Sequence, residues 1–151
     1  SVADAAQGGL QWRHVPAYVA AQCVGAFGGV AAAHVMFSEP TFFLSHHARP
    51  GPAQVFSEFI ATFGLLIVIA GCARRRPMDV PFAVGGYITA AYWFTSSTSF
   101  ANPAVTLARA FSDTFAGIRP SDVPGFIAAQ FVAIGAAILF NRWVMPAKQA
   151  A

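Results

Sequence analysis

Four long apolar stretches, separated by polar or proline-containing segments, dominate the pattern of hydrophobic and polar positions. They cover residues 15–37, 55–72, 81–95 (continuing toward Phe100) and 123–145. Each approaches the length of about 20 residues that a helix needs to cross a bilayer. The first stretch is rich in glycine and alanine, and small residues let helices approach closely in lipid. The pattern therefore predicts four membrane-spanning helices.

A fifth segment, residues 95–111, lies between the third and fourth apolar stretches and follows a different pattern. It opens with a run of serine and threonine and continues with Asn102-Pro103-Ala104. Asparagine is a favoured N-cap and proline a favoured first helical residue, so we expect a helix from Asn102 to about Ser112. This helix is too short to cross a bilayer. It is either a surface element or a re-entrant half-helix beside a watery cavity.

The composition is that of a membrane protein. Hydrophobic residues make up 56% of the 151 residues and charged residues only 10%, whereas an average soluble domain has about 25% charged residues. The many aromatic residues exclude intrinsic disorder. The net charge of +3 comes without any pattern that points to nucleic acid. Cys23 and Cys72 fall in or at the end of apolar runs, where we expect buried packing and no disulfide.

The distribution of basic residues predicts the orientation of the chain. The run Arg74-Arg75-Arg76 directly follows an apolar stretch, which marks the cytoplasmic side of a membrane protein. Both termini are then inside, the 38–54 loop is outside, the 73–80 loop is inside, and the 95–123 segment enters from outside. The basic residues assigned to the inner side are Arg13, Arg142 and Lys148, and those assigned to the outer side are Arg49 and Arg119.

The first and last apolar stretches resemble each other. Residues 16–24 match residues 124–132 with a shared proline and glutamine at equal spacing, and residues 1–5 resemble residues 106–110. Two apolar helices can match by chance, but the shared proline and glutamine favour a common repeat. The repeat unit would be two spanning helices, a half-helix and a third spanning helix.

The repeat predicts how the chain is divided. Residues 1–37 are the tail of a first unit, namely the end of its half-helix region and its third spanning helix. Residues 38–54 are an outer loop, and residues 55–151 are a complete second unit. Because three spans separate the equivalent helices, the two units face opposite ways in the membrane, as in many transport proteins. We therefore expect two spanning helices and a first Asn-Pro-Ala motif upstream of Ser1.

These motifs resemble the aquaporin and glycerol-facilitator family, the major intrinsic proteins. The resemblance rests on Asn102-Pro103-Ala104 after its hydroxyl-rich approach, and on Glu58-Phe-Ile-Ala-Thr-Phe opening the helix two spans earlier. It covers essentially the whole chain. Residues 91–106 and 113–118 further resemble a bacterial subgroup found near arsenic-resistance genes. The resemblance implies that the chain forms part of an all-α, right-handed aquaporin-like bundle. This part has four spanning helices and one half-helix.

The resemblance implies roles for the half-helix motif and for three buried polar residues. In the family, two half-helices meet at the membrane centre, and Asn102 of the motif would donate a hydrogen bond to the passing solute; the alternative role is an ordinary N-cap. The family counterpart of Glu58 accepts hydrogen bonds from loop backbone, so a structural role is expected. Gln22 and Gln130 are interpreted as interhelical hydrogen-bonding residues.

Val105 departs from the family pattern. Most members carry arginine directly after the second Asn-Pro-Ala, where it narrows the outer pore and makes it positive. Spacing gives Ala90 and Ser99 as two other residues of the selectivity filter, the narrow part of the pore, and both are small. The fourth filter residue belongs to the first unit. Arg109 lies one turn beyond Val105. It either restores positive charge near the outer mouth or is a solvated outer residue.

The leading hypothesis is a channel for passive diffusion of small uncharged solutes: water, glycerol, arsenite or methylated arsenicals. The expected setting is a bacterial inner membrane, as a multi-pass protein that is a homotetramer when full length. No cofactor, metal or enzymatic motif is predicted, and His34, His46 and His47 lack a ligand cluster at metal-binding spacing. The alternatives are a non-channel scaffold or subunit and a non-functional truncated product.

Overall fold

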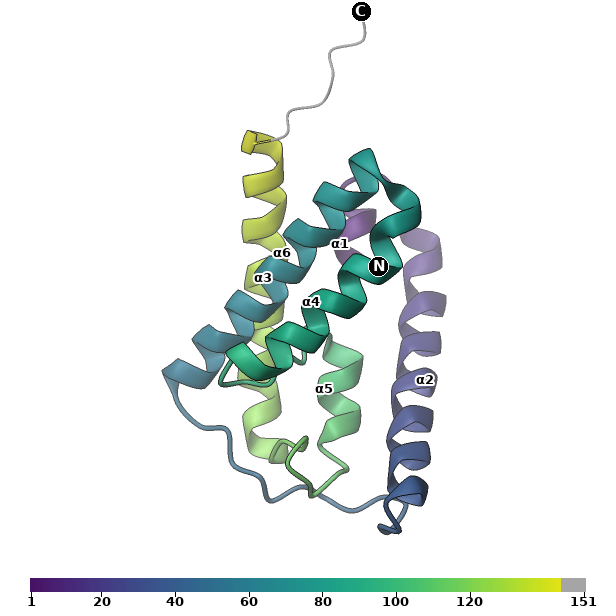
Figure 1. Cartoon of the computed structure of the whole chain (residues 1–151), viewed down its shortest axis with the longest axis vertical. Helices are drawn as coiled ribbons and strands as arrows, with labels where there is room; N and C mark the ends of the chain where they lie inside the picture. The colour runs from purple at the N-terminus through teal and green to yellow at the C-terminus, as the bar shows by residue number, and fades with distance from the viewer. Residues whose placement is uncertain (145–151) are drawn as a thin grey trace, which may run out of the picture.

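The computed structural model describes residues 1–144, and this part of the chain is helical without strands (Figure 1). The predicted end of the last span at Met145 and the predicted inner position of Lys148 lie outside the described residues. The elements in chain order are α1 (Val2–Ala5), η1 (Trp12–His14), α2 (Val15–Met36), α3 (Pro52–Arg75), η2 (Pro77–Asp79), α4 (Val80–Phe94), α5 (Pro103–Arg109), η3 (Pro120–Asp122) and α6 (Val123–Val144).

Proline marks the start of every long helix. α2, α3, α4 and α6 each have a proline in the first turn, and in α2, α4 and α6 it follows a valine. The fixed φ of proline suits this position, where its missing N–H would have no helical partner. The 3-10 turns η1, η2 and η3 directly precede α2, α4 and α6. A local sequence signal thus sets where each long helix begins.

Three of the four predicted spans are long and apolar enough to cross a membrane. They are Trp12–Met36, Pro52–Arg75 and Pro120–Val144, which include α2, α3 and α6. α4 has 15 residues, which at a rise of about 1.5 Å per residue gives about 22 Å. This is less than the hydrocarbon thickness of about 30 Å.

The expected continuation of the third span toward Phe100 is wrong. α4 ends at Phe94, and the next residue, Thr95, is extended with φ −100° and ψ 137°. The Thr95 hydroxyl donates to the carbonyl oxygen of Ala91 at 2.6 Å. Hydroxyl side chains compete in this way for backbone groups, which favours helix ends over helix interiors. The hydroxyl-rich run therefore stops the helix.

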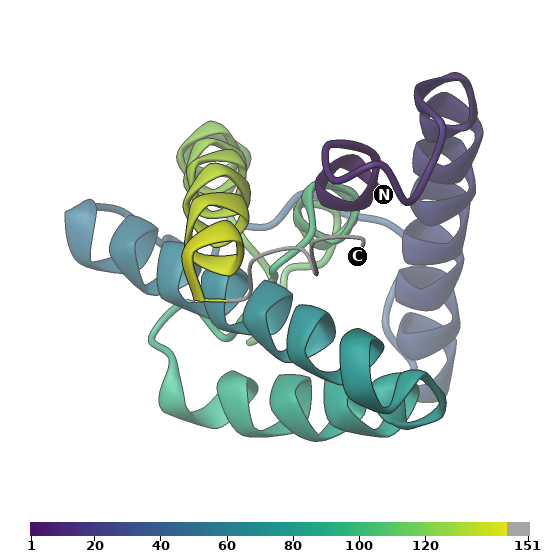
Figure 2. The same cartoon turned by 90° about the horizontal axis from the view of Figure 1, so that it is seen from above.

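The short helix α5 lies in the middle of the bundle. It contacts α2 on one side and α6 on the other, while α3 packs against both α4 and α6. The short N-terminal helix α1 contacts α6, and Figures 1 and 2 together place it above α5 along the long axis of the molecule. Large apolar side chains are exposed on α2, α4 and α6, as a lipid-facing surface requires; examples are Val24, Phe82, Trp93 and Trp143.

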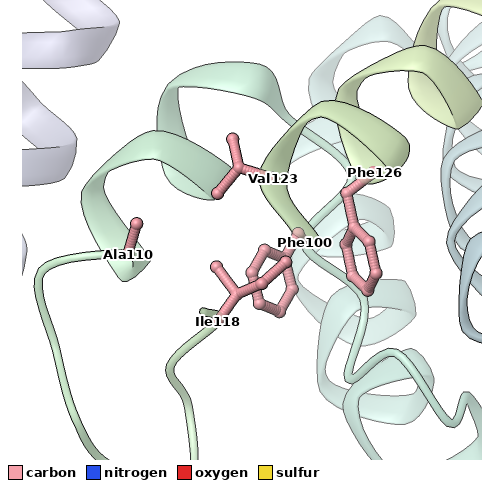
Figure 3. Close-up of a cluster of buried hydrophobic side chains, with 5 residues drawn as sticks. All are labelled: Phe100, Ala110, Ile118, Val123 and Phe126. Carbon is pink, nitrogen blue, oxygen red and sulfur yellow. The ribbon is translucent and has the colours of Figure 1, made fainter. Parts of the chain in front are cut away.

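A small buried cluster joins the segments around α5 to the start of α6 (Figure 3). Its centre is the edge-to-face contact of Phe100 with Phe126, whose ring centroids are 5.2 Å apart. Such aromatic pairs stabilise by roughly 0.5–1.5 kcal/mol beyond the area they bury. The cluster fixes the loops on both sides of α5 against α6. Its members are Phe100, Ala110, Ile118, Val123 and Phe126.

Candidate functional site

α5 begins where the Asn-Pro-Ala motif predicts. Asn102 is the N-cap, with an extended backbone, and its Oδ1 accepts a hydrogen bond from the N–H of Ala104 at 2.8 Å. Pro103 occupies the first helical position. An asparagine cap of this kind stabilises a helix by about 1 kcal/mol relative to alanine. The predicted start of the half-helix is therefore confirmed.

The other end of α5 lies at Arg109, three residues before the predicted Ser112. The N–H groups of Ala110 and Phe111 donate to carbonyls three residues back, which tightens the last turn. The carbonyl oxygen of Arg109 then accepts from the N–H groups of Ser112 and Ile118 at 3.3 Å. The Arg109 carbonyl thus bonds to loop N–H groups and not to a further helical turn, so the helix ends at Arg109.

The approach to α5 is unwound and holds an unusual backbone. Thr98, Ser99 and Ala101 have positive φ values of 59°, 48° and 49°. Side chains other than glycine rarely adopt this left-handed region, and each such residue costs of order 1–3 kcal/mol unless its surroundings hold it. The conformation therefore depends on contacts from elsewhere in the chain.

Glu58 provides these contacts from within α3. Its side chain is fully buried, and its carboxylate accepts from the N–H of Phe100 at 3.1 Å and from that of Ala101 at 2.6 Å. The Nε2 of Gln130 donates to the same carboxylate at 2.7 Å. Charge-assisted hydrogen bonds are among the stronger ones in proteins. Glu58 thus ties the unwound approach to α3 and α6.

The two glutamines make similar contacts with the two short helices, α1 and α5. Gln130 of α6 donates to the Oγ1 of Thr106 in α5 at 2.8 Å. Gln22 of α2 donates to the Oγ of Ser1, next to α1, at 2.7 Å. The Nδ2 of Asn102 approaches the Oε1 of Gln22 at 3.5 Å, the outer limit of a hydrogen bond. The Nδ2 group of the Asn102 amide is therefore only loosely held.

The start of α5 borders a cavity of about 290 Å³ that also reaches α1. Val2 and Ala3 from the start of α1 also line it, as do residues of α3 and α6. The site residues predicted from sequence that meet around this cavity are Asn102, Pro103, Ala104, Gln22 and Gln130.

A larger cavity of about 630 Å³ lies between α2, α5 and the loop after α5. Val105 and Arg109 both line it, together with Tyr92 at the end of α4. The other two predicted filter residues lie elsewhere: Ala90 is exposed on α4, and Ser99 is buried. Neither lines one of the two cavities. Among residues 1–144 the structure thus groups Val105 with Arg109 and leaves Ala90 and Ser99 apart.

Arg109 is half-buried, and its guanidinium is held by several contacts. Its carbon Cζ lies 3.6 Å from the centroid of the Phe100 ring, and its Nη2 donates to the Oγ1 of Thr98 at 2.9 Å. Its Nε donates to the carbonyl oxygen of Ala116. Arginine often stacks on aromatic faces in this way. The side chain is therefore fixed beside the unwound approach and does not extend into solvent.

Arg49 is a site residue that the sequence analysis placed only as an outer basic residue. It is 3% exposed, and its guanidinium donates to the carbonyl oxygens of Gly117, Ser97 and Phe115 at 2.7, 3.0 and 2.9 Å. The carbon Cζ of Arg49 also lies 5.1 Å from the centroid of the Phe100 ring. All of its partners lie far along the chain, so no local pattern signals this burial.

The loop between α2 and α3 is fastened to the segment after α5. The N–H of Ser45 donates to the carbonyl oxygen of Ala110 at 2.9 Å, and the N–H of Arg119 donates to that of His47 at 2.8 Å. Burial, followed by the nearby charge of Arg49, lowers the pKa of His47. These bonds hold the loop between α2 and α3 against the segment after α5.

The histidines have structural partners. His34 is 3% exposed; its Nδ1 lies 2.7 Å from the carbonyl oxygen of Thr41, and its Nε2 lies 2.8 Å from the Oγ of Ser112. Because a carbonyl only accepts, Nδ1 carries a proton. His46 is exposed and pairs with Asp113. Within residues 1–144 no group of three or more His, Cys, Asp or Glu residues is placed to hold a metal ion.

Known proteins match this chain at the level of a family. A sequence model described as major intrinsic protein matches residues 1–99. The chain is 50% identical to Aquaglyceroporin AqpS of Rhizobium meliloti (strain 1021) over 145 residues, which cover 96% of this chain and 62% of that protein. It is 34% identical to Aquaporin NIP1-3 of Oryza sativa subsp. japonica over 114 residues, which cover 71% of this chain and 40% of that protein.

The share of each protein that is covered decides what these matches show about the chain. The chain spans less than two-thirds of the length of either curated relative, and no solved structure matches it. The match to the family model covers well over half of the chain, and the helical architecture with its three apolar spans agrees with it. The resemblance noted from the sequence is confirmed: the chain belongs to the major intrinsic protein family.

Proposed function

We propose that this chain forms part of a channel for the passive diffusion of small uncharged solutes across a bacterial inner membrane. The observation that carries the proposal is the position of Asn102. Asn102 lines the 290 Å³ cavity. Its Oδ1 caps α5, while its Nδ2 has one contact, at 3.5 Å. An amide held in place by its oxygen, with its N–H groups loosely bonded, can donate to a passing solute at little cost.

The proposed solutes include molecules larger than water. Val105 brings a small apolar side chain to the larger cavity, at the position where most family members carry the longer arginine. A wide constriction of this kind suits glycerol, arsenite or a methylated arsenical, because pore diameter and the lining donors select among neutral solutes. One relative bears the name aquaglyceroporin, which supports a glycerol-sized solute.

The proposed channel contains more than this chain. We expect two further spanning helices, a first Asn-Pro-Ala motif before Ser1, and a homotetramer of the full-length protein. The matched relatives are longer than this chain, and α1 contacts α6 as α5 contacts α2. Both observations support an assembly from two inverted halves.

The test is transport by the full-length protein in proteoliposomes. Vesicles that contain the protein should swell faster than protein-free vesicles in isotonic glycerol or urea, and an ion gradient should leave the rate unchanged. A folded, reconstituted protein that gives no more flux than lipid alone would contradict the proposal. An acceleration that requires an ion gradient would indicate a coupled transporter instead.

A further inference from the structure

We propose that Arg109 is the specificity-determining residue of the outer half of the pore, where its guanidinium excludes cations. The inference rests on the proposed channel function and names the group that makes the channel select against positive charge. It starts from the apolar Val105 and from the cavity that Val105 shares with Arg109.

The geometry places Arg109 at the level of the outer cavity. Residues four apart in a helix lie on the same face, so Val105 and Arg109 present their side chains to the same space. Both line the cavity of about 630 Å³. A charge on Arg109 therefore acts on any solute that passes Val105.

The guanidinium is held in a fixed position. It stacks on Phe100, and its Nε and Nη2 donate to Ala116 and Thr98. Its Nη1 makes no hydrogen bond to any residue of the 1–144 region. An arginine that is anchored through some of its guanidinium N–H groups keeps the others free to donate to a ligand. A neutral solute with a hydroxyl or carbonyl oxygen can accept from them.

No ion pair within the described residues includes the guanidinium of Arg109 or of Arg49. The ion pairs within residues 1–144 join His46 to Asp113, Arg76 to Asp79 and Arg119 to Asp122, and none includes Arg109 or Arg49. Arg49 adds a second guanidinium over the ring of Phe100. One acidic residue, Glu39, lines the cavity from the exposed loop after α2. The buried carboxylate of Glu58 also acts on both guanidiniums, but it is bonded to the N–H groups of Phe100 and Ala101 and does not line this cavity. At the cavity itself, Glu39 is the one carboxylate beside Arg109 among the residues that the structure describes.

A cation that enters this cavity is repelled, whereas a neutral solute of the same shape is not. At an effective dielectric constant of about 20, the repulsion between two like charges about 8 Å apart changes an equilibrium constant by roughly tenfold or more. Guanidinium ion and urea are planar, of nearly equal size, and differ in charge. Guanidinium is also weakly hydrated compared with ammonium ions, so dehydration contributes less to its exclusion.

The experiment compares urea and guanidinium permeability of the full-length protein in proteoliposomes. The wild type should pass urea and exclude guanidinium. Arg109→Gln should raise the guanidinium-to-urea ratio about tenfold, and Arg109→Lys, which keeps the charge, should raise it much less. The matched control is Arg119→Gln, which removes an exposed arginine from the same outer side and should leave the ratio unchanged, because exposed charges are screened by salt.

A second variant tests the charge without removing the anchored side chain. Val105→Glu places a carboxylate one turn from Arg109, where it neutralises the guanidinium, and the ratio should rise relative to Val105→Gln. If both Arg109→Gln and Val105→Glu conduct urea with the wild-type ratio, the inference is wrong while the channel stands. If the wild type conducts no urea, the proposed function fails and this inference fails with it.

Discussion

Gln22 donates to the Oγ of Ser1 at 2.7 Å, and this bond is the counterpart of the bond from Gln130 to Thr106 at 2.8 Å. In each pair the hydroxyl belongs to a short helix segment and the amide to the long helix that follows it. Ser1 and Thr106 occupy the same place in the two similar stretches of sequence, as do Gln22 and Gln130. The same side-chain bond at both places supports the proposal that the chain contains parts of two related units.

The buried carboxylate of Glu58 gives a prediction for stability. Glu58→Gln should lower the free energy of unfolding by about 1–3 kcal/mol. An amide has one oxygen in place of two, so it cannot accept from Phe100, Ala101 and Gln130 together. Thermal unfolding of the full-length protein in detergent measures the effect. Glu39→Gln, on an exposed loop, is the control, and an equal loss in the two variants would contradict the prediction.

Two substitutions distinguish the two roles of Asn102, which are to cap α5 and to donate a hydrogen bond to a solute. Asn102→Ala removes both the cap on Ala104 and the amide donor, so stability should fall by about 1 kcal/mol and glycerol flux should fall as well. Asn102→Ser keeps a capping oxygen and lacks the amide N–H groups. Its stability should stay near that of the wild type while its flux falls. Unfolding temperature and vesicle swelling measure the two quantities, and normal flux in Asn102→Ser would exclude a solute-binding role for the amide.

The apolar Val105 gives a prediction for selectivity. Val105→Arg adds bulk and a second cation beside Arg109, so flux of glycerol and arsenite should fall several-fold while water permeability falls much less. Single water molecules can pass by bonding to guanidinium donors, but larger solutes must squeeze past the side chain. Swelling and arsenite uptake are measured in parallel for both proteins. Equal arsenite flux would show that Val105 does not set the constriction.

The loop between α2 and α3 should respond to acid through its contact with Asp113. The backbone N–H of His46 donates to this carboxylate at 2.7 Å, the His46 ring lies 3.0 Å from it, and these hydrogen bonds lower the pKa of Asp113 below its ordinary value of 3.8. A group with a lowered folded pKa stabilises the fold above its unfolded pKa and loses this contribution as the pH falls through its folded pKa. The His46 contact should therefore persist at pH 4 and weaken only under more acidic conditions.

NMR titration of the His46 amide in detergent micelles measures this transition. Its midpoint should lie below 3.8, and it should disappear in Asp113→Asn, which keeps an oxygen to accept the same N–H. Because both side chains are on the surface, the effect on global stability should be small. A midpoint at or above the ordinary value would show that the His46 bonds do not stabilise the carboxylate.

The sequence by itself determined the features that depend on neighbouring residues. Valine-proline and proline starts set where the long helices begin, and Asn102-Pro103 sets the start of α5. Runs of about 20 apolar residues predicted the spanning helices, because length and composition are what a bilayer selects. These signals are local, so a linear reading of the chain is sufficient.

Only the tertiary structure decided how the approach to α5 is held and where the arginines lie. The positive φ values of Thr98, Ser99 and Ala101 depend on Glu58, and the burial of Arg49 depends on carbonyls from two later loops. Arg109, open to two interpretations in the sequence, stacks on Phe100 because Phe100 is itself fixed against Phe126. Each of these positions results from groups that are distant along the chain, and a buried charge or strained backbone is stable only when folding brings such partners together.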